Sequence, residues 1–354
     1  MVIPMRRYWK IAALSLAMLC AAGGASAQHV YYQMVDEAGN VVYDTGWKIR
    51  VGDEFLTHDN KRYEITHIEG SKARVRLIGQ EQLVEISPLE RQRRLGNGII
   101  GMGLARAEER KKVAIYHTHN DEAYVPSDGT ESADDGRGGI LRVGDAFGAA
   151  LEKNGLAVVH SENSHIPHDN MAYERSRRTV VSLLKEGPAA VFDVHRDATP
   201  PEAYRGEIDG QDVTKVQLVV GKYGPTSKQI EEYALQMKAA SDNLHPGLVK
   251  GIFFAKGGDY NQDLHPKSML VEVGAHTNSR EAAERGVAMF ADAIPVVLQV
   301  SSANPSNVSG AAGVGTEASG PSGSMKSIGW IVGITAAGAI LFLFLSTGSV
   351  QRCV

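Results

Sequence analysis

The sequence predicts an α/β fold: a mostly parallel sheet with helices on both faces, preceded by a small β-rich domain. From residue 113 onward, short apolar runs alternate with longer stretches of helical spacing, the pattern of a parallel sheet that helices cover on both faces. Before residue 93, apolar and polar residues alternate between turn signals, which indicates antiparallel strands. Hydrophobic residues make up 43% of the chain, enough for an ordinary buried core.

The small β-rich domain is expected over residues 28–92. Its clearest signal is a hairpin, in which alternating runs at 63–68 and 73–78 flank the turn sequence Glu69-Gly70-Ser71-Lys72. Residues 93–112 are charged, contain glycine and have no clear period. They are therefore expected to form a connector to the next domain.

The larger domain is expected over residues 113–300. Its expected strands are 113–116, 156–159, 189–194, 216–220, 252–255 and 268–273. Its expected helices are 140–154, 173–185, 227–241 and 280–299. In open sheets of this class, ligands bind beyond the carboxyl ends of the strands, so functional residues are sought there.

The N-terminal residues 1–27 have the features of a secretory signal peptide. Basic residues precede an apolar run at 11–22, and Ala25-Ser26-Ala27 supplies small residues before the expected cut ahead of Gln28. An N-terminal membrane anchor is the alternative interpretation of this segment.

A transmembrane helix is expected at 327–347, because this stretch is uncharged and almost wholly apolar. Residues 301–326 are rich in Ser, Gly and Ala and are expected to form a flexible linker. Residues 348–354 would be a short cytoplasmic tail. Together with the signal peptide, these segments predict an exported, periplasmic domain that the C-terminal helix anchors to the inner, cytoplasmic membrane.

The composition argues against two classes of function. The formal net charge is −4 and the chain has no basic block, so no nucleic-acid partner is expected. The two cysteines, Cys20 and Cys353, fall in the expected signal peptide and the expected tail. The exported domain is therefore expected to have neither a disulfide framework nor a cysteine nucleophile.

Groups that bind metal or transfer protons lie at three of the expected strands. The first strand is followed by His117, His119 and Glu122, the third by His195, and the last contains Glu272. A catalytic zinc site takes three protein ligands from His, Asp or Glu and leaves one position open for water. The pattern therefore predicts a metal-dependent hydrolase.

His119, Glu122 and His195 form the most economical set of metal ligands. His119 and Glu122 have the H-x-x-E spacing, which brings both side chains to one ion when the backbone turns between them. His117 stays open as the first ligand instead, because residues two apart on a strand point to the same face.

Glu272 is the candidate carboxylate for proton transfer, which a zinc hydrolase needs beside its metal. Asp193 and Asp197 flank His195 and are expected to orient its ring. Three further histidines are expected in a solvated loop: His160, His165 and His168.

Four segments occur in one order along the chain. They are Ile115-Tyr116-His117-Thr118-His119 with Glu122, Asp193-Val194-His195-Arg196-Asp197-Ala198, Tyr260-Asn261-Gln262-Asp263-Leu264, and Leu270-Val271-Glu272-Val273-Gly274 followed by Asn278. Together they resemble the stage II sporulation protein P family of cell-wall hydrolases, which act on bacterial peptidoglycan. The similarity runs from about residue 113 to 298, and residues 52–79 resemble the small β region that precedes the catalytic domain in related proteins.

The resemblance implies a zinc-dependent N-acetylmuramoyl-L-alanine amidase, which cleaves the amide between N-acetylmuramic acid and the L-alanine of the stem peptide. A second, peptide-cleaving activity is associated with the family. The implied Zn²⁺ ligands are one histidine of the pair His117 and His119, together with Glu122 and His195, and the implied catalytic carboxylate is Glu272. Glu131 is the alternative acidic ligand, because its distance from His117 resembles the spacing in other zinc amidases.

The resemblance also suggests residues that bind the substrate. Asn261, Gln262 and Asp263 are expected to hold the stem peptide or to form a turn, and Asn278 is a further substrate-binding candidate. Arg196 is expected to pair with a stem-peptide carboxylate during catalysis, or to form an internal salt bridge with a neighbouring acid. The expected partners are peptidoglycan and a regulatory or wall-machinery protein.

One departure from the family concerns the biological process. The sporulation proteins carry an N-terminal membrane segment, whereas the stronger apolar segment lies at the C-terminus here, so the sporulation role is not carried over. Two other functions stay open: a stem-peptide carboxypeptidase or endopeptidase, and a non-catalytic wall-binding module. A complete set of His119, Glu122, His195 and Glu272 argues against the module, which has no need for one.

Overall fold

The computed structural model describes residues 31–83 and 110–300. Five strands precede the gap at 84–109: β1 (Tyr32–Val35), β2 (Val41–Thr45), β3 (Glu54–Thr57), β4 (Lys61–Glu69) and β5 (Lys72–Gln80). The predicted hairpin is confirmed, since β4 and β5 pair antiparallel and close at the Glu69–Lys72 pair. Gly70 has φ 60° in this turn, a conformation that glycine adopts without steric cost.

The second part of the chain alternates strands and helices. Its strands are β6 (Lys112–Tyr116), β7 (Ala157–His160), β8 (Ala190–Asp197), β9 (Arg205–Ile208), β10 (Gln211–Thr214), β11 (Val216–Gly221), β12 (Val249–Ala255) and β13 (Ser268–Ala275). Its helices are α3 (Val125–Asp128), α4 (Ile140–Lys153), α5 (Ala172–Leu184), α6 (Ser227–Leu244), α7 (Arg280–Phe290) and α8 (Ala293–Val300).

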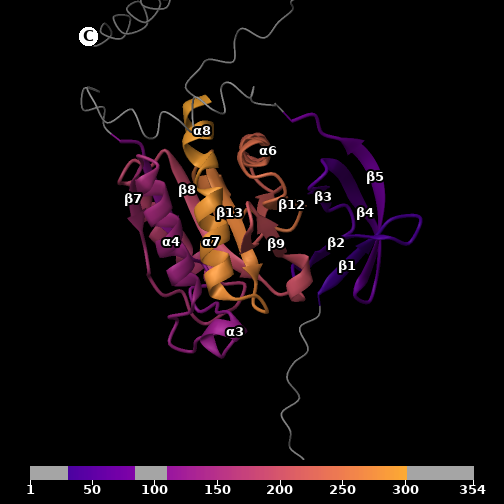
Figure 1. Cartoon of the computed structure of the whole chain (residues 1–354), viewed down its shortest axis with the longest axis horizontal. Coiled ribbons are helices and arrows are strands. Elements are labelled where there is room, and N and C mark those ends of the chain that lie inside the picture. Colours follow the sequence, from indigo (N-terminus) through magenta and orange to yellow (C-terminus); the bar gives the residue numbers. More distant parts are fainter. Residues whose placement is uncertain (1–30, 84–109, 301–354) are drawn as a thin grey trace, which may run out of the picture. The chain divides into compact units, whose positions relative to one another are not determined.

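The described strands form one 11-stranded sheet and a separate hairpin of β9 and β10. The order in the sheet is β2-β1-β5-β4-β3-β12-β11-β13-β8-β6-β7. In the second part of the chain every neighbouring pair of this sheet is parallel except β11 with β13. The N-terminal strands extend the sheet, because β3 pairs antiparallel with β12 (Figure 1).

Successive side chains of a strand point to opposite faces of the sheet, and in the buried strands both faces are covered by helices. In β6, Val113 and Ile115 join the core beneath α4 and α7, whereas Ala114 and Tyr116 pack against Val180 of α5 on the other face. Figure 1 shows α4 and α7 side by side over the first face. This arrangement confirms the predicted α/β class with a small β-rich region in front.

Two elements differ from the sequence predictions. The helix expected at 280–299 is divided into α7 and α8, which begins at Ala293. Pro295 explains the break, because in a continuous helix its ring would clash with the carbonyl of residue 291, whereas the first turn of α8 tolerates it. The β9–β10 hairpin was not predicted, although its turn residues Asp209 and Gly210 are a common hairpin signal and both have positive φ.

The expected membrane anchor has to be corrected. Within residues 31–83 and 110–300, no helix is both long and apolar enough to cross a membrane. The span expected at 327–347 lies outside the described residues, so a periplasmic domain anchored through this helix is not carried further. The signal peptide expected at 1–27, the linker at 301–326, the tail at 348–354 and most of the connector at 93–112 also lie outside them.

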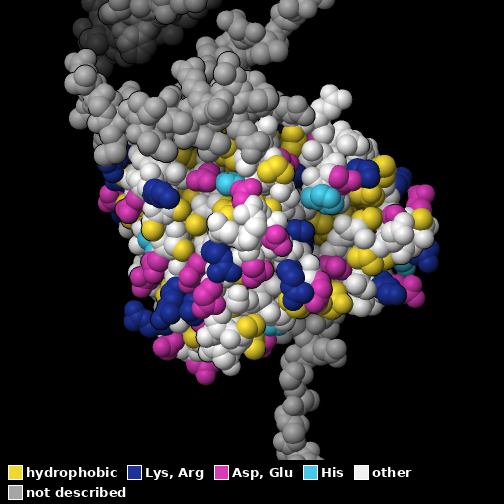
Figure 2. Space-filling model, in the orientation of Figure 1, with side chains coloured by type: hydrophobic (Ala, Val, Ile, Leu, Met, Phe, Trp, Pro, Cys, Tyr) yellow, Lys and Arg dark blue, Asp and Glu magenta, His cyan; other side chains and the backbone are white. Residues whose placement is uncertain are grey.

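The charged side chains of the described residues are mixed on the face in Figure 2. Lysine and arginine lie interspersed with aspartate and glutamate there, rather than gathered into one broad basic area. Several of them form ion pairs across elements. Arg62 of β4, for example, contacts Glu54 of β3 at 2.6 Å and Glu231 of α6 at 2.7 Å, which ties the N-terminal strands to the helical layer.

Candidate metal centre

Two segments bring His119, Glu122 and His195 together at one end of the sheet. Strand β6 ends at Tyr116, and the loop after it turns so that the backbone N–H of Glu122 donates to the carbonyl of His119 at 3.2 Å. This turn places Glu122 Oε1 3.5 Å from His119 Nδ1. His195 lies in the neighbouring strand β8, and its Nδ1 is also 3.5 Å from Glu122 Oε1. The predicted H-x-x-E turn is therefore present.

Two observations indicate that these three residues could hold a metal ion. One nitrogen or oxygen of each lies within 4.8 Å of those of the other two, and Glu122 and His195 are almost fully buried. His119 Nε2 is buried and has no hydrogen-bond partner among the described residues. Two imidazoles and one carboxylate are a donor set of catalytic zinc sites. Among the described residues a second group, Asp145, His160 and Glu162, also lies close enough to share an ion, but two of its members are exposed. The buried cluster of His119, Glu122 and His195 is therefore the candidate metal centre.

Asp193 lies on the far side of the His195 ring. Its Oδ1 is 2.9 Å from His195 Nε2, at ion-pair distance though not aligned for a hydrogen bond. Thr118 fixes this carboxylate, donating from its backbone N–H at 2.8 Å and from its hydroxyl at 2.6 Å. A carboxylate behind a metal-binding histidine fixes the orientation of the ring and raises its basicity. Asp193 is thus placed as expected, whereas Asp197 points elsewhere.

Opposing effects set the charges of Glu122 and His195. Burial opposes the charge of Glu122, but His195 and Arg196 outweigh it and hold the pKa of this carboxyl well below its usual value. Burial likewise opposes a charged His195, but Asp193 and Glu122 raise the pKa of this imidazole well above its usual value. Without a metal, a proton on His195 thus balances the charge of Glu122, and a bound cation would take the place of that proton.

Arg196 supports the loop that carries Glu122. Its backbone N–H donates to Glu122 Oε2 at 2.9 Å, and its guanidinium donates to the carbonyls of Ala123 at 3.4 Å and Glu131 at 2.9 Å. Arg196 Nη1 also lies 3.9 Å from Glu122 Oε1. These contacts match the internal salt bridge that was the alternative for Arg196, and its catalytic role stays a prediction.

Glu272 lies opposite His195 in the parallel pair of β13 and β8. Its Oε1 accepts a hydrogen bond from the indole N–H of Trp47 at 2.7 Å, and its Oε2 accepts none from the described residues. Burial and the neighbouring Asp197 raise the pKa of this carboxyl well above its usual value. The surroundings of Glu122 and Glu272 therefore shift the pKa values of these two carboxyls in opposite directions.

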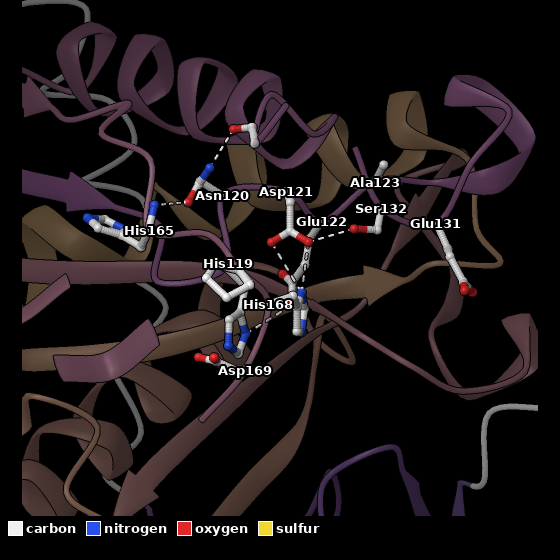
Figure 3. A network of polar contacts seen from close by, with 12 residues as sticks. His119, Asn120, Asp121, Glu122, Ala123, Glu131, Ser132, His165, His168 and Asp169 are labelled. Carbon is white, nitrogen blue, oxygen red and sulfur yellow. Dashed lines mark hydrogen bonds and ion pairs between the residues drawn. The ribbon is translucent and has the colours of Figure 1, made fainter. Parts of the chain in front are cut away.

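His117 lies outside the cluster of three. Its Nδ1 donates to the carbonyl of Val194 at 2.8 Å, and its Nε2 is 2.8 Å from His160 Nε2. Burial and His160 lower the pKa of His117 to about 3. Both ring nitrogens are thus used inside the protein. Glu131 does not join the three either, and Figure 3 shows its side chain away from His119 and Glu122.

The loop after β7 contributes histidines that were expected to be solvated. His168 stacks on His119, with ring centroids 4.0 Å apart, and its Nδ1 contacts Asp121 Oδ2 at 3.0 Å (Figure 3). The contact with Asp121 raises the pKa of His168. His165 is only 4% exposed and bonds the carbonyl of His117 at 2.8 Å. The prediction of a solvated loop is therefore wrong for His165, and spacing gave no signal for the stacking of His168.

The four substrate-binding candidates have protein partners. Asn261 donates to the carbonyl of Tyr173 at 3.1 Å, and Asp263 pairs with Arg177 at 2.5 Å. The side-chain amide of Gln262 accepts from one backbone N–H of β11 and donates to one backbone carbonyl of the same strand. Asn278 accepts from the N–H of Ala275 at 2.9 Å and donates to the carbonyl of Pro201 at 3.1 Å. Substrate binding by these residues stays an untested prediction.

The chain is similar to known proteins in its sequence and in its fold. The sequence model of one family, described as stage II sporulation protein P, matches residues 54–295. The stage II sporulation protein P of Bacillus subtilis (strain 168) is 30% identical in an alignment over 202 residues that covers 52% of this chain and 50% of that protein. The chain thus spans about half the length of this curated relative.

Three solved structures are similar to this chain in fold, at a lower sequence identity than the Bacillus protein. The N-acetylmuramoyl-L-alanine amidase AmiC2 of Nostoc punctiforme is 18% identical, with 53% of this chain and 97% of that chain covered and a TM-score of 0.34. The CwlD amidase of Clostridioides difficile, solved in complex with the GerS lipoprotein, is 15% identical, with 54% and 100% covered and a TM-score of 0.36. A metallo-carboxypeptidase of Burkholderia cenocepacia is 11% identical, with 71% and 81% covered and a TM-score of 0.33. TM-scores this low carry no conclusion about activity.

Proposed function

Because the chain belongs to the stage II sporulation protein P family, as its motifs predicted, we propose that it is a zinc-dependent peptidoglycan hydrolase. The proposed bond is the amide between N-acetylmuramic acid and the L-alanine of the stem peptide. One observation carries the proposal: His119, Glu122 and His195 converge within 4.8 Å, and Glu272 lies opposite His195 in the adjacent strand.

His119, Glu122 and His195 would hold the Zn²⁺ ion, and Asp193 would fix the ring of His195. When bound, Zn²⁺ lowers the pKa of a water molecule and polarises the substrate carbonyl. Neutral imidazole nitrogens and an ionised carboxylate are the forms that bind metal. The low pKa of Glu122 supports the second of these, and His195, whose pKa is raised without metal, would release its proton when an ion binds.

Glu272 would move the proton. Its Oε2 accepts no hydrogen bond from the described residues. In the ionised form, which a bound cation nearby would favour, this oxygen would take a proton from the attacking water. The raised pKa of Glu272 would let it keep this proton at neutral pH until it is delivered to the leaving amino group of L-alanine. General acid–base catalysis of this kind contributes roughly 10²- to 10⁴-fold to a rate.

The proposal is tested by the release of dye-labelled fragments from isolated sacculi. The wild-type chain should release dye, a chelator should stop the release, and added Zn²⁺ should restore it. Glu272→Gln should keep its zinc and lose roughly 10²- to 10⁴-fold in rate. No release despite bound zinc would favour either a missing activator or the wall-binding module. No release after envelope extract is added to supply an activator, with binding to sacculi retained, would contradict the proposal and favour the module.

A protein that controls the hydrolase stays part of the proposal. An uncontrolled wall hydrolase harms its own cell, so a regulatory or wall-machinery partner is expected. Co-purification with crosslinked envelope proteins would identify it, and full activity of the isolated chain would contradict the need for an activator.

A further inference from the structure

The indole of Trp47 comes from the N-terminal strands and reaches the end of β13. Strand β2 ends at Thr45, and the chain then bends at Gly46 and Trp47. Trp47 Nε1 donates to Glu272 Oε1 at 2.7 Å, although the two residues are separated by 225 positions in the sequence. Trp47 also lies outside residues 54–295, the part that the family's sequence model matches.

Asp197 holds the segment that carries Trp47. Its Oδ1 accepts a hydrogen bond from the backbone N–H of Gly46 at 2.8 Å, and its Oδ2 lies 3.3 Å from the hydroxyl of Thr45. The hydroxyl of Tyr204 donates to the same Oδ2 at 2.9 Å. A carboxylate that is only 3% exposed and accepts several donors is a rigid anchor, because breaking these bonds would leave a buried charge unpaired.

Gly46 makes this close approach possible. A Cβ at position 46 would lie 2.7 Å from Asp197 Oδ1 and 2.8 Å from the carbonyl oxygen of Ala198. Both distances are shorter than real Cβ atoms allow, so another residue at position 46 would push the segment away from β8. The glycine thus sets the distance between Trp47 and the end of the sheet.

Two aromatic rings fix the orientation of the indole. Trp47 meets Tyr260 edge-on, with centroids 5.1 Å apart and an interplanar angle of 85°, and lies 6.2 Å from the ring of Phe253. Such offset and edge contacts hold aromatic pairs in preferred geometry. The indole N–H is therefore aimed at Glu272 by packing as well as by its own hydrogen bond.

Trp47 is the donor that decides which oxygen of Glu272 stays available. Glu272 is 2% exposed, its Oε1 is bonded to Trp47, and its Oε2 has no hydrogen-bond partner among the described residues. We propose that Trp47 is a positioning residue, which fixes the carboxylate of Glu272 so that Oε2 faces the reacting groups. The N-terminal strands would then complete the catalytic site. The pairing stands on geometry alone, whereas its role in catalysis rests on the proposed function.

The first test uses Trp47→Phe in the full chain, which keeps a six-membered aromatic ring and removes the N–H donor together with the five-membered ring of the indole. With labelled sacculi, kcat should fall roughly ten- to a hundredfold, because a catalytic group displaced by about 1 Å loses rate on that scale. KM and zinc content should stay at wild-type values. Tyr63→Phe, a change in the same strands and away from Glu272, is the matched control and should leave kcat unchanged.

The second test separates positioning from a general loss of structure. Denaturant midpoints are measured for Trp47→Phe, Glu272→Met and the double variant, because contacting residues show non-additive effects. If the pair is coupled, Trp47→Phe lowers the midpoint in the wild-type background and changes it much less in the Glu272→Met background. Additive shifts would overturn the pairing, and unchanged kcat in Trp47→Phe would overturn the positioning role.

The proposed hydrolase function and the positioning role of Trp47 can be told apart by these tests. If the wild-type chain hydrolyses no sacculi, the proposed function fails together with the catalytic role of Trp47, while the denaturant cycle still decides whether Trp47 and Glu272 are coupled. If the wild-type chain hydrolyses sacculi and Trp47→Phe matches it in kcat, only the inference about Trp47 is overturned.

Discussion

Glu272 of β13 and His195 of β8 are partners in the parallel register of the two strands. The register is interrupted directly after Glu272, where Gly274 has φ 72°. Bulges of this kind re-aim side chains and occur often beside active sites. The pairing brings the candidate proton-transfer carboxylate next to a candidate metal ligand on buried strands, which is the geometric basis of the proposed hydrolase.

Loss of any one of the three ligands should abolish tight zinc binding. His119→Ala, Glu122→Gln and His195→Ala each remove a donor from the cluster within 4.8 Å. Zinc content by plasma mass spectrometry and zinc affinity by calorimetry measure the effect. His117→Gln is the matched control, because both ring nitrogens of His117 have protein partners, and it should retain zinc. Equal zinc loss in His117→Gln would contradict this ligand assignment.

Asp193→Asn should weaken zinc binding without abolishing it. The change removes the charge behind His195 Nε2, which lies 2.9 Å from Asp193 Oδ1. Outer partners of metal ligands are typically worth about 10- to 100-fold in affinity or activity. Competition with a chromogenic zinc chelator gives the affinity. An unchanged affinity would show that Asp193 serves the fold and not the centre.

Two glycines on the same helix, α4, should respond differently to alanine. A Cβ at Gly144 would lie 2.5 Å from His117 Nε2 and 2.7 Å from His160 Nε2, whereas at Gly148 the nearest atom is 3.4 Å away. Gly144→Ala should lower the free energy of unfolding by about 1–3 kcal/mol through overpacking. Gly148→Ala should be neutral or raise it by up to about 1 kcal/mol, because alanine favours helix. Chemical denaturation compares the two, and equal effects would refute the close contact at Gly144.

Lys250 should make the free energy of unfolding depend on pH in the alkaline range. Burial lowers the pKa of Lys250 to about 8, although Asp197 and Asp44 act against this, and its Nζ donates to the carbonyl of Asp44 at 2.8 Å. The ordinary value is 10.5, so between about pH 8 and 10.5 the unfolded chain binds more protons than the folded one. Stability should therefore rise with pH across this window.

Denaturant midpoints from pH 7 to 10.5 measure the effect of Lys250. Lys250→Met should lose the part of the rise that this lysine causes. Lys72→Met, which removes an exposed lysine of β5, should keep the wild-type profile. A profile of Lys250→Met that parallels the wild type would contradict the buried state of this lysine.

The sequence allowed the fold class and the three-residue cluster to be predicted, because the strands and the spacing of His119 and Glu122 are local patterns. His195 joined them through the expectation that functional residues lie at the ends of parallel strands. Apolar runs identified the strands, and the turn from His119 to Glu122 needs only a short spacing. The contacts of Trp47 with Glu272 could not be predicted, since they depend on β3 pairing with β12 and on Asp197 fixing the segment at Gly46.

Some features carried a signal that was not used. The break before α8 follows from Pro295, and the β9–β10 hairpin from the sequence Asp209-Gly210. No sequence signal separates His117 from the cluster, because His117 and His119 are both histidines near the same strand end. The His117 ring is held away from the cluster by its contacts with His160 and the carbonyl of Val194, and these contacts depend on the folded structure.

The central claim is tested most directly by the mass of the products that the full chain releases from purified peptidoglycan. An amidase predicts intact stem peptides with a free L-alanine amino group, together with glycan that keeps its lactyl carboxylate. This release should stop with chelator and return with Zn²⁺. Shortened peptides that remain attached to muramic acid, or release that persists without metal, would contradict the account.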